Sequence, residues 1–299
     1  MATQKQLDYN RKTSAELGWQ PSWFGESNFD DALISKIIEF QIEHRITADG
    51  YCGPGTYRRV YTERMSKMDD IDPGASCQSD SIVYNGEFYP IKWNKVVHWF
   101  DKGGLGIIDG AYTSYAGKEK RPIKMFINHW DVCLSSESCV KILNKRKVSA
   151  QFCIDNDGTI YQTMDMQHAA WHAGNRKVNN SSVGVEISNA YYLKYQDTYI
   201  SRGFGARPII SGAKVHGNKL EDFLGFYPVQ LDALAALWEA INSCTDTPFE
   251  LPKEEFEVSP SVAAGKFAGF ANHYHVTERK IDCACLDNQK VLDAATDLS

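Results

Sequence analysis

The sequence predicts a mixed α/β fold, in which a central mixed β-sheet is flanked by helices and preceded by a small helical domain. Three observations support this prediction. Between residues 81 and 299, short apolar stretches typical of strands alternate with longer amphipathic stretches typical of helices. Residues 1–70 contain amphipathic helical patterns. Residues 71–80, "IDPGASCQSD", have the Asp, Pro, Gly and Ser content of a linker, so we place the domain boundary there.

The N-terminal segment shows two helical patterns. In "NFDDALISKIIEFQIEHRI", residues 28–46, apolar side chains recur at three- and four-residue steps, as on one face of a helix. Asp30 or Asn28 is a suitable N-cap for this helix. A glycine-rich turn, "TADGYCGPG", separates it from a second short helix at "TYRRVYTERM", residues 56–65. These patterns predict a small helical unit.

The second part of the chain supplies the sheet and the helices around it. Four stretches are strand-like: "SIVYNGEFYPI" with a turn at Asn85-Gly86, "KMFINHW", "AQFCIDNDGTIYQTM" and "SSVGVEISNAYY". Two stretches predict helices, "SSESCVKILNKRK" and "VQLDALAALWEAINSC". The stretch from Gln196 to Tyr227 has no period and predicts a surface loop that borders the site. Residues 81–120 are either an added edge of the sheet or a specificity element.

The composition excludes two classes of partner. The 299 residues carry a formal net charge of -6 with scattered Lys and Arg, so no basic surface is expected to attract nucleic acid. No stretch approaches the roughly 18 apolar residues of a membrane span, and "MATQKQLDYNRKTSAELGWQ" contains no signal-peptide-like run. We therefore expect a protein that stays in the cytoplasm unless another component releases it. We also expect it to be a monomer. The eight cysteines are expected to be reduced thiols.

Side chains of the types that bind metals occur in three stretches beyond the linker. His129 ends a strand pattern in "FINHWD", and Glu186 lies in "VGVEIS". A catalytic zinc ion takes three protein ligands of the His, Asp, Glu or Cys type and leaves one position open for water. Ligands from separate strands form no compact motif, so spacing alone does not choose among the candidates. The stretch "NHYHVTERKIDCAC" adds His273, His275, Lys280, Asp282, Cys283 and Cys285.

The octet "HAAWHAGN", residues 168–175, places two histidines beside Trp and Ala, which by itself favours a packed core. Read together with "INHWD", "SAQFCIDNDGTIYQTM", "NNSSVGVEISN" and "HVTERKID", however, it resembles the type 2 N-acetylmuramoyl-L-alanine amidases. This zinc-dependent family includes bacteriophage enzymes. The similarity runs through much of residues 121–290 in the same order. It implies a catalytic cleft that binds Zn2+.

The resemblance also implies which residues hold the zinc ion. His129 matches the first ligand, His273 the second and Asp282 the third. His275 remains an alternative to His273, because the run before the Arg-Lys pair is one residue shorter than in the family. Cys283 remains an alternative to Asp282, because Cys-Ala replaces the Pro-Gly that usually follows.

Three further roles are implied by the resemblance. Glu186 would take the proton of the attacking water and transfer it to the leaving nitrogen. Lys280 would stabilise the oxyanion of the tetrahedral intermediate. His172, in "AWHAG", matches a histidine on the substrate side of the metal.

The N-terminal unit has its own resemblance, to the three-helix peptidoglycan-binding domain. In that domain a helix ending in Phe-Gln is followed by Asp-Gly-x-x-Gly-x-x-Thr and a second helix. Phe40, Asp49 and Gly50 fall in place as cell-wall-binding residues, accompanied by the matching positions Gln41, Gly53 and Thr56.

The two resemblances together imply a phage endolysin whose partner is bacterial peptidoglycan. Such an enzyme cleaves the amide bond between N-acetylmuramic acid and L-alanine, and it waits in the host cytoplasm until a separate membrane pore releases it. The alternative is a non-catalytic peptidoglycan-recognition protein. Intact His129, Glu186, Lys280 and Asp282 favour the enzyme.

Overall fold

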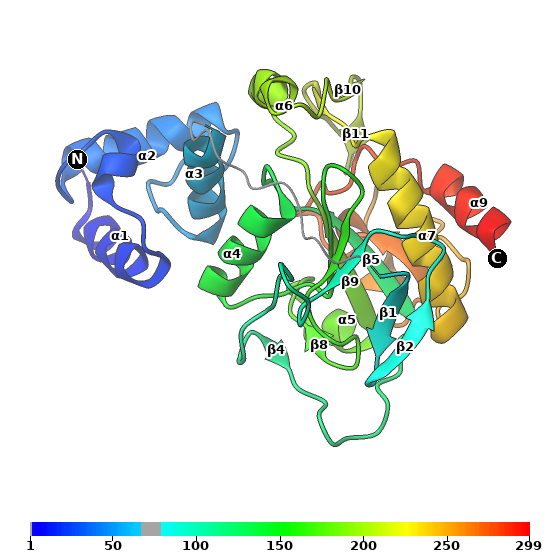
Figure 1. The fold of residues 1–299 in the computed structure, drawn as a ribbon. Coiled ribbons are helices and arrows are strands. Elements are labelled where there is room, and N and C mark those ends of the chain that lie inside the picture. Colours follow the sequence, from blue (N-terminus) through cyan, green and yellow to red (C-terminus); the bar gives the residue numbers. More distant parts are fainter. Residues whose placement is uncertain (1, 67–78) are drawn as a thin grey trace. The chain divides into compact units, whose positions relative to one another are not determined.

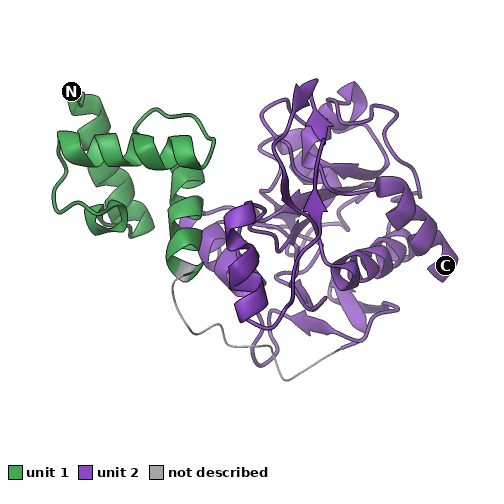
Figure 2. Cartoon of the chain, turned by 90° about the horizontal axis from the view of Figure 1, so that it is seen from above, with its two compact units in different colours: residues 1–71 green, residues 72–299 purple. Residues whose placement is uncertain are grey.

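The computed structural model describes residues 2–66 and 79–299. The chain divides into two compact units, Met1–Ile71 and Asp72–Ser299 (Figure 1, Figure 2). Most of the predicted linker at residues 71–80 lies outside the described residues. Among the residues described, no helix is both long enough and apolar enough to cross a membrane.

The N-terminal unit consists of helices α1 (Gln4–Leu17), α2 (Asp31–Glu43) and α3 (Pro54–Ser66), with a 3-10 turn, η1 (Pro21–Phe24). Asp30 caps α2, and its carboxylate accepts hydrogen bonds from the backbone N–H groups of Ala32 and Leu33. Helix α1 begins with a capping box between Thr3 and Gln6. The apolar pattern does not predict α1, because most of this helix is polar.

Gln41 organises the turn between α2 and α3. Its side chain is 1% exposed. Nε2 donates to Asp49 Oδ1 (2.9 Å), the Tyr51 carbonyl (3.0 Å) and Thr56 Oγ1 (3.1 Å), while Oε1 accepts from the Gly50 N–H (2.8 Å). Each buried group left without its partner costs about 1–3 kcal/mol, so this glutamine fixes the turn.

The residues predicted to bind the cell wall have clear packing roles. Phe40 contacts Phe24 edge to face, with ring centroids 5.5 Å apart. Gly50 has φ of 72°, and a Cβ there would meet Gln6 Nε2 and Ile34 Cγ2 at 2.9 Å. Asp49 accepts from Gln41. These contacts show that the three residues stabilise the fold of the N-terminal unit. Their contact with the cell wall stays a prediction.

The second unit is built on a six-stranded sheet of order β14-β5-β9-β6-β7-β3. Strands β14, β5, β9 and β6 run parallel to one another, β7 is antiparallel to β6, and β3 is parallel to β7. The predicted mixed sheet is therefore confirmed, and β3 shows that residues 81–120 supply an edge strand. The strand bounds are β3 (Val96–His98), β5 (Met125–Trp130), β6 (Phe152–Ile154), β7 (Ile160–Gln162), β9 (Ser182–Ile187) and β14 (Gly269–Asn272).

Short strand pairs surround this sheet. The hairpin of β1 (Ser81–Tyr84) and β2 (Glu87–Pro90) turns at Asn85-Gly86, where both φ angles are positive, 55° and 77°. Strand β4 (Tyr112–Thr113) pairs with β8 (Ala169–Ala170).

The stretch from Gln196 to Tyr227 is not the irregular loop that its sequence predicts. It contains α6 (Gln196–Ser201), which follows the 3-10 turn η2 (Leu193–Tyr195). Strand β10 (Ile209–Ile210) pairs with β13 (Phe223–Leu224), and β11 (Lys214–Val215) pairs with β12 (Asn218–Lys219). Two-residue strands are too short to produce a detectable period, which explains the wrong prediction.

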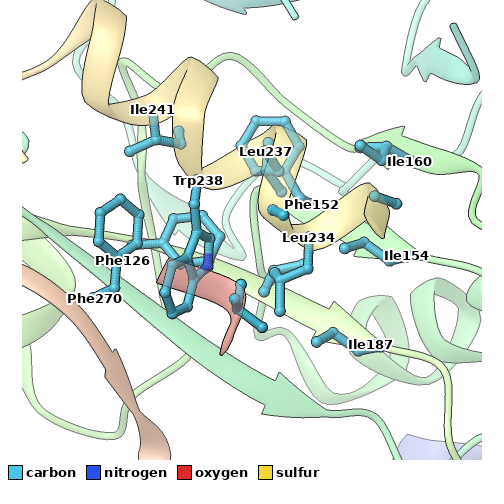
Figure 3. Packing of buried hydrophobic residues seen from close by; sticks show 14 of the residues in the cluster. Phe126, Phe152, Ile154, Ile160, Ile187, Leu234, Leu237, Trp238, Ile241 and Phe270 are labelled. Carbon is cyan, nitrogen blue, oxygen red and sulfur yellow. The ribbon is translucent and has the colours of Figure 1, made fainter. Parts of the chain in front are cut away.

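Helix α7 (Pro228–Cys244) covers one face of the sheet, and α9 (Asn288–Leu298) packs against α7 (Figure 1). Trp238 of α7 is fully buried and stacks on Phe270, with ring centroids 4.4 Å apart (Figure 3). Removing an aromatic side chain from such a core costs about 3–5 kcal/mol. Apolar side chains from β5, β6, β7 and β9 complete this layer, namely Phe126, Phe152, Ile154, Ile160 and Ile187.

The opposite face has a smaller apolar cluster. Met125 and Ile127 of β5 pack there with Val178 of α5 (Arg176–Ser181) and Val262 of α8 (Pro260–Ala263). Helix α4 (Ser136–Arg146) also contacts β9. Because strand side chains alternate between faces, His129 lies on the same face as Met125 and Ile127.

Candidate metal centre

Neighbouring parallel strands bring the first two ligand candidates together. His129 is the next-to-last residue of β5, and His273 opens the 3-10 turn η3 (His273–His275) directly after β14. Asn272 of β14 is the register partner of Asn128 of β5. The residues that follow these two, His273 and His129, therefore lie side by side at the end of the sheet. Asp282 lies in the turn that comes after η3.

The ligand atoms of these three side chains form a small triangle. His129 Nδ1 lies 2.8 Å from His273 Nδ1. Asp282 Oδ2 lies 2.9 Å from His273 Nδ1 and 3.3 Å from His129 Nδ1. All three residues are buried, with exposures of 2%, 4% and 7% for His129, His273 and Asp282.

Burial and mutual charge set the protonation of this cluster. Burial lowers the pKa of His129, and the charge of His273 lowers it further. Burial alone would raise the pKa of Asp282. The charge of His273 and the side-chain contacts with His129 and His273 outweigh it and hold the pKa of Asp282 well below its usual range. The cluster therefore favours a neutral His129 beside a carboxylate, which are the forms that bind metals.

The donor set fits a zinc ion. Two imidazole nitrogens and one carboxylate oxygen are ligands that zinc commonly takes, and three protein ligands leave one position for water. Ligand atoms of a tetrahedral zinc ion, each about 2 Å from the metal, are separated by roughly 3.3 Å. The three observed separations, 2.8, 2.9 and 3.3 Å, are close to this value.

The two alternative ligands lie elsewhere. His275 Nδ1 accepts from the Asn272 N–H (2.9 Å) and Nε2 donates to the Glu254 carbonyl (2.9 Å), so both of its ring nitrogens have protein partners. Burial lowers the pKa of His275 to about 4. The Cys283 side chain is 0% exposed and packs in the apolar cluster under α7. These contacts favour His273 and Asp282 as the ligands.

Glu186 is fixed next to the triangle by the sheet. It is the register partner of His129 between β9 and β5, and its residue is 6% exposed. Its charge is close enough to raise the pKa of His129 against the effect of burial. A carboxylate in this position can exchange protons with a group bound at the triangle.

Lys280 lies two residues before Asp282 in an exposed part of the turn. Its charge contributes to lowering the pKa of Asp282. The Lys280 carbonyl accepts a hydrogen bond from His216 Nε2 (3.0 Å), so the segment between Gln196 and Tyr227 does contact the site.

His172 contacts the triangle through His129. Its Nδ1 lies 2.9 Å from His129 Nε2, and its Nε2 lies 3.0 Å from Ser182 Oγ. Burial lowers the pKa of His172 well below its usual value, and the charges of His129 and His273 add to this. The predicted substrate-side role of His172 stays a prediction. The sequence offers no signal for Ser182, which is one of several serines in its stretch.

A second group of buried side chains, Asp131, Cys133 and Cys139, lies within metal-binding distance of one another. The Asp131 carboxylate already accepts hydrogen bonds from the backbone N–H groups of Cys133 and Asn189 and from Ser188 Oγ. It therefore shapes the turn after β5.

Comparisons with known proteins agree with the family predicted from the sequence. The N-acetylmuramoyl-L-alanine amidase family matches residues 119–282. Among solved structures, the chain is similar to AmpDh3 from Pseudomonas aeruginosa in complex with anhydromuramic pentapeptide, with 19% identity and a TM-score of 0.39. That alignment covers 64% of this chain and 66%, slightly less than two thirds, of AmpDh3.

The chain is also similar to a selenomethionine derivative of AmpD, with 18% identity and a TM-score of 0.37, over 64% of this chain and 93% of AmpD. No match is found among curated proteins. The range matched by the family is more than half of the chain and contains the triangle, Glu186, Lys280 and His172. The chain therefore belongs to the N-acetylmuramoyl-L-alanine amidase family.

Proposed function

We propose that the protein is a zinc-dependent peptidoglycan amidase, which hydrolyses the amide bond between N-acetylmuramic acid and L-alanine. The observation that carries this proposal is the buried triangle of His129, His273 and Asp282 with Glu186 in register beside it. The family membership of the chain supports the same reaction.

Each residue has a chemical task in this reaction. When bound at the triangle, a zinc ion supplies Lewis-acid activation of water and of the amide carbonyl. Glu186 takes one proton from the attacking water and returns it to the amide nitrogen as the C–N bond breaks. Lys280 stabilises the negative charge that develops on the carbonyl oxygen. The products are the carboxylic acid of the muramic acid side chain and the free amine of L-alanine.

Digestion of purified peptidoglycan tests the bond that is cleaved. The expected products carry new N-terminal L-alanine and no new reducing sugar ends, and removal of zinc with a chelator stops their formation. New reducing ends would identify a glycosidase and refute the proposal. Binding without any new ends would identify the non-catalytic alternative.

We further infer an endolysin role, in which the N-terminal unit holds the enzyme on the wall of the bacterial host and a phage encodes the chain. The resemblance of the Phe-Gln and Asp-Gly motifs to peptidoglycan-binding domains supports the wall-binding part. Attachment of a weak binding module raises the local concentration of the catalytic unit at its substrate. The lytic role is tested by adding the purified protein to permeabilised bacteria and measuring the fall in turbidity.

A further inference from the structure

We infer that Ser182 and His172 form a hydrogen-bond relay that fixes the tautomer and ring orientation of His129. This inference rests on the zinc site proposed above, because its consequence is that Nδ1 of His129 is the nitrogen presented to the metal. In this relay His172 is a positioning residue, because it acts on the metal site only by orienting the ring of His129.

The proton of Ser182 sets the direction of the relay. Ser182 Oγ donates to the Val178 carbonyl at 2.7 Å, its shortest polar contact. A hydroxyl has one proton, so Ser182 Oγ can only accept from His172 Nε2, which lies 3.0 Å away. His172 Nε2 therefore carries the ring proton, and in the neutral ring Nδ1 is left as an acceptor.

The acceptor on His172 then fixes His129. His172 Nδ1 faces His129 Nε2 at 2.9 Å, and the two rings are nearly perpendicular, at 87°. His129 Nε2 must supply the proton of this contact, which leaves the lone pair of His129 on Nδ1. Nδ1 is the atom in the triangle with His273 and Asp282. Hydrogen bonding at the far nitrogen of a ligating histidine fixes its tautomer and orientation.

Gly184 provides the space that the relay needs. Ser182, Gly184 and Glu186 alternate along β9 and share one face of the sheet. A Cβ at Gly184 would meet Cγ and Nδ1 of His172 at 2.7 Å, a distance that requires the ring to move. The glycine before the glutamate in "VGVEIS" thus allows His172 to lie against the strand between Ser182 and Glu186.

Zinc affinity measured by chelator competition tests the relay without using activity. Ser182→Ala is expected to weaken zinc binding about ten-fold, which is the lower end of the usual effect of residues behind a metal ligand. Ser181→Ala is the matched control, since Ser181 Oγ also donates to a backbone carbonyl, that of Lys177 at 3.0 Å, and has no hydrogen bond to His172. Equal affinity of the Ser182→Ala and Ser181→Ala proteins would overturn the relay.

A double-mutant cycle distinguishes the relay from a general loss of stability. In His172→Asn the side-chain oxygen can accept from His129 but no longer reaches Ser182. Adding Ser182→Ala to His172→Asn is therefore expected to leave the zinc affinity unchanged. A further ten-fold loss in that background would show that the hydroxyl acts by another route, and the inference would be wrong.

The tautomer of His172 is read directly by 15N NMR of the wild-type protein, with and without zinc. We expect protonated Nε2 and unprotonated Nδ1 on His172 in both samples. A proton on Nδ1 would refute the relay even if zinc binds. Failure of the wild-type protein to bind zinc would instead refute the proposed function, and the two results are independent.

Discussion

His129 and Glu186 are register partners on the adjacent parallel strands β5 and β9. Partners in neighbouring strands emerge on the same face of a sheet, and the strands are about 4.8 Å apart. The proposed metal ligand and the proposed proton carrier are therefore both held by the backbone hydrogen bonds of the sheet. Substitution of one residue at a time can therefore separate zinc binding, proposed for His129, from proton transfer, proposed for Glu186.

Glu186→Gln keeps the shape of the side chain and removes its ability to exchange a proton. We expect zinc content to remain at the wild-type level while kcat falls about 10²–10⁴-fold, the usual contribution of a general acid–base group. Metal content and turnover of a soluble muropeptide are measured on the same sample. Loss of zinc from this protein would mean that Glu186 is itself a ligand.

The two histidines of η3 are expected to differ when each is changed to glutamine. His273→Gln should lose zinc, because His129 and Asp282 alone form an incomplete coordination sphere. His275→Gln should keep zinc and unfold at a lower temperature, because the ring loses buried hydrogen bonds to Asn272 and Glu254. The reverse pattern of metal content would make His275 the ligand.

Much of the fold is predictable from the sequence where an apolar pattern extends over enough residues or a turn motif is present. Helix α7, strand β5 and the Asn85-Gly86 hairpin follow their apolar patterns and turn residues closely. Helix α1 is too polar to show a stripe, and β10 to β13 are too short for a period. In these segments tertiary contacts determine the structure.

The candidate site divides in the same way. Residue types and family resemblance are enough to name His129, Glu186 and the stretch from His273 to Cys283. Which residues of that stretch lie near His129 depends on the turn that follows η3. This turn brings Asp282 to His129 and His273. Ser182 has no sequence signal at all, because its proposed role depends on the position of His172, which the fold brings against β9.

Asp155 predicts a pH dependence of stability. Burial raises the pKa of this carboxyl to about 6, although hydrogen bonds from the backbone of Asn156 and Ser136 oppose it. Since the folded pKa lies above the ordinary value of 3.8 for an aspartate, the favourable contribution of the protonated form is complete below about pH 4. It is lost as the pH rises through 6, and the loss amounts to about 3 kcal/mol.

Asp155→Asn removes this titration. Between pH 4.5 and 7.5 the wild-type protein should therefore lose free energy of unfolding relative to the variant, as measured by urea denaturation. A chelator is present throughout, so that the pH dependence of metal binding does not contribute. A difference between the two proteins that stays constant with pH would contradict the prediction.

The N-terminal unit is expected to affect wall binding and not chemistry. A shortened chain of residues 79–299 should keep zinc and cleave soluble muropeptides at the full-length rate, because the second unit has its own core. It should sediment with purified cell walls less well than the full chain. Equal sedimentation of the two proteins would remove the proposed role of Phe40, Asp49 and Gly50.

The third ligand is tested by substitutions at Asp282 and Cys283. Asp282→Ala should abolish bound zinc and activity together, since the carboxylate closes the triangle with His129 and His273. Cys283→Ser should retain zinc but destabilise the protein by about 1–3 kcal/mol, because a hydroxyl replaces a thiol packed among apolar side chains. If Cys283 were the ligand, the serine variant would lose zinc and Asp282→Asn would keep it, because thiolate and hydroxyl ligands are not interchangeable. Metal content and thermal unfolding, measured on all three variants beside the wild-type protein, separate loss of a ligand from loss of packing.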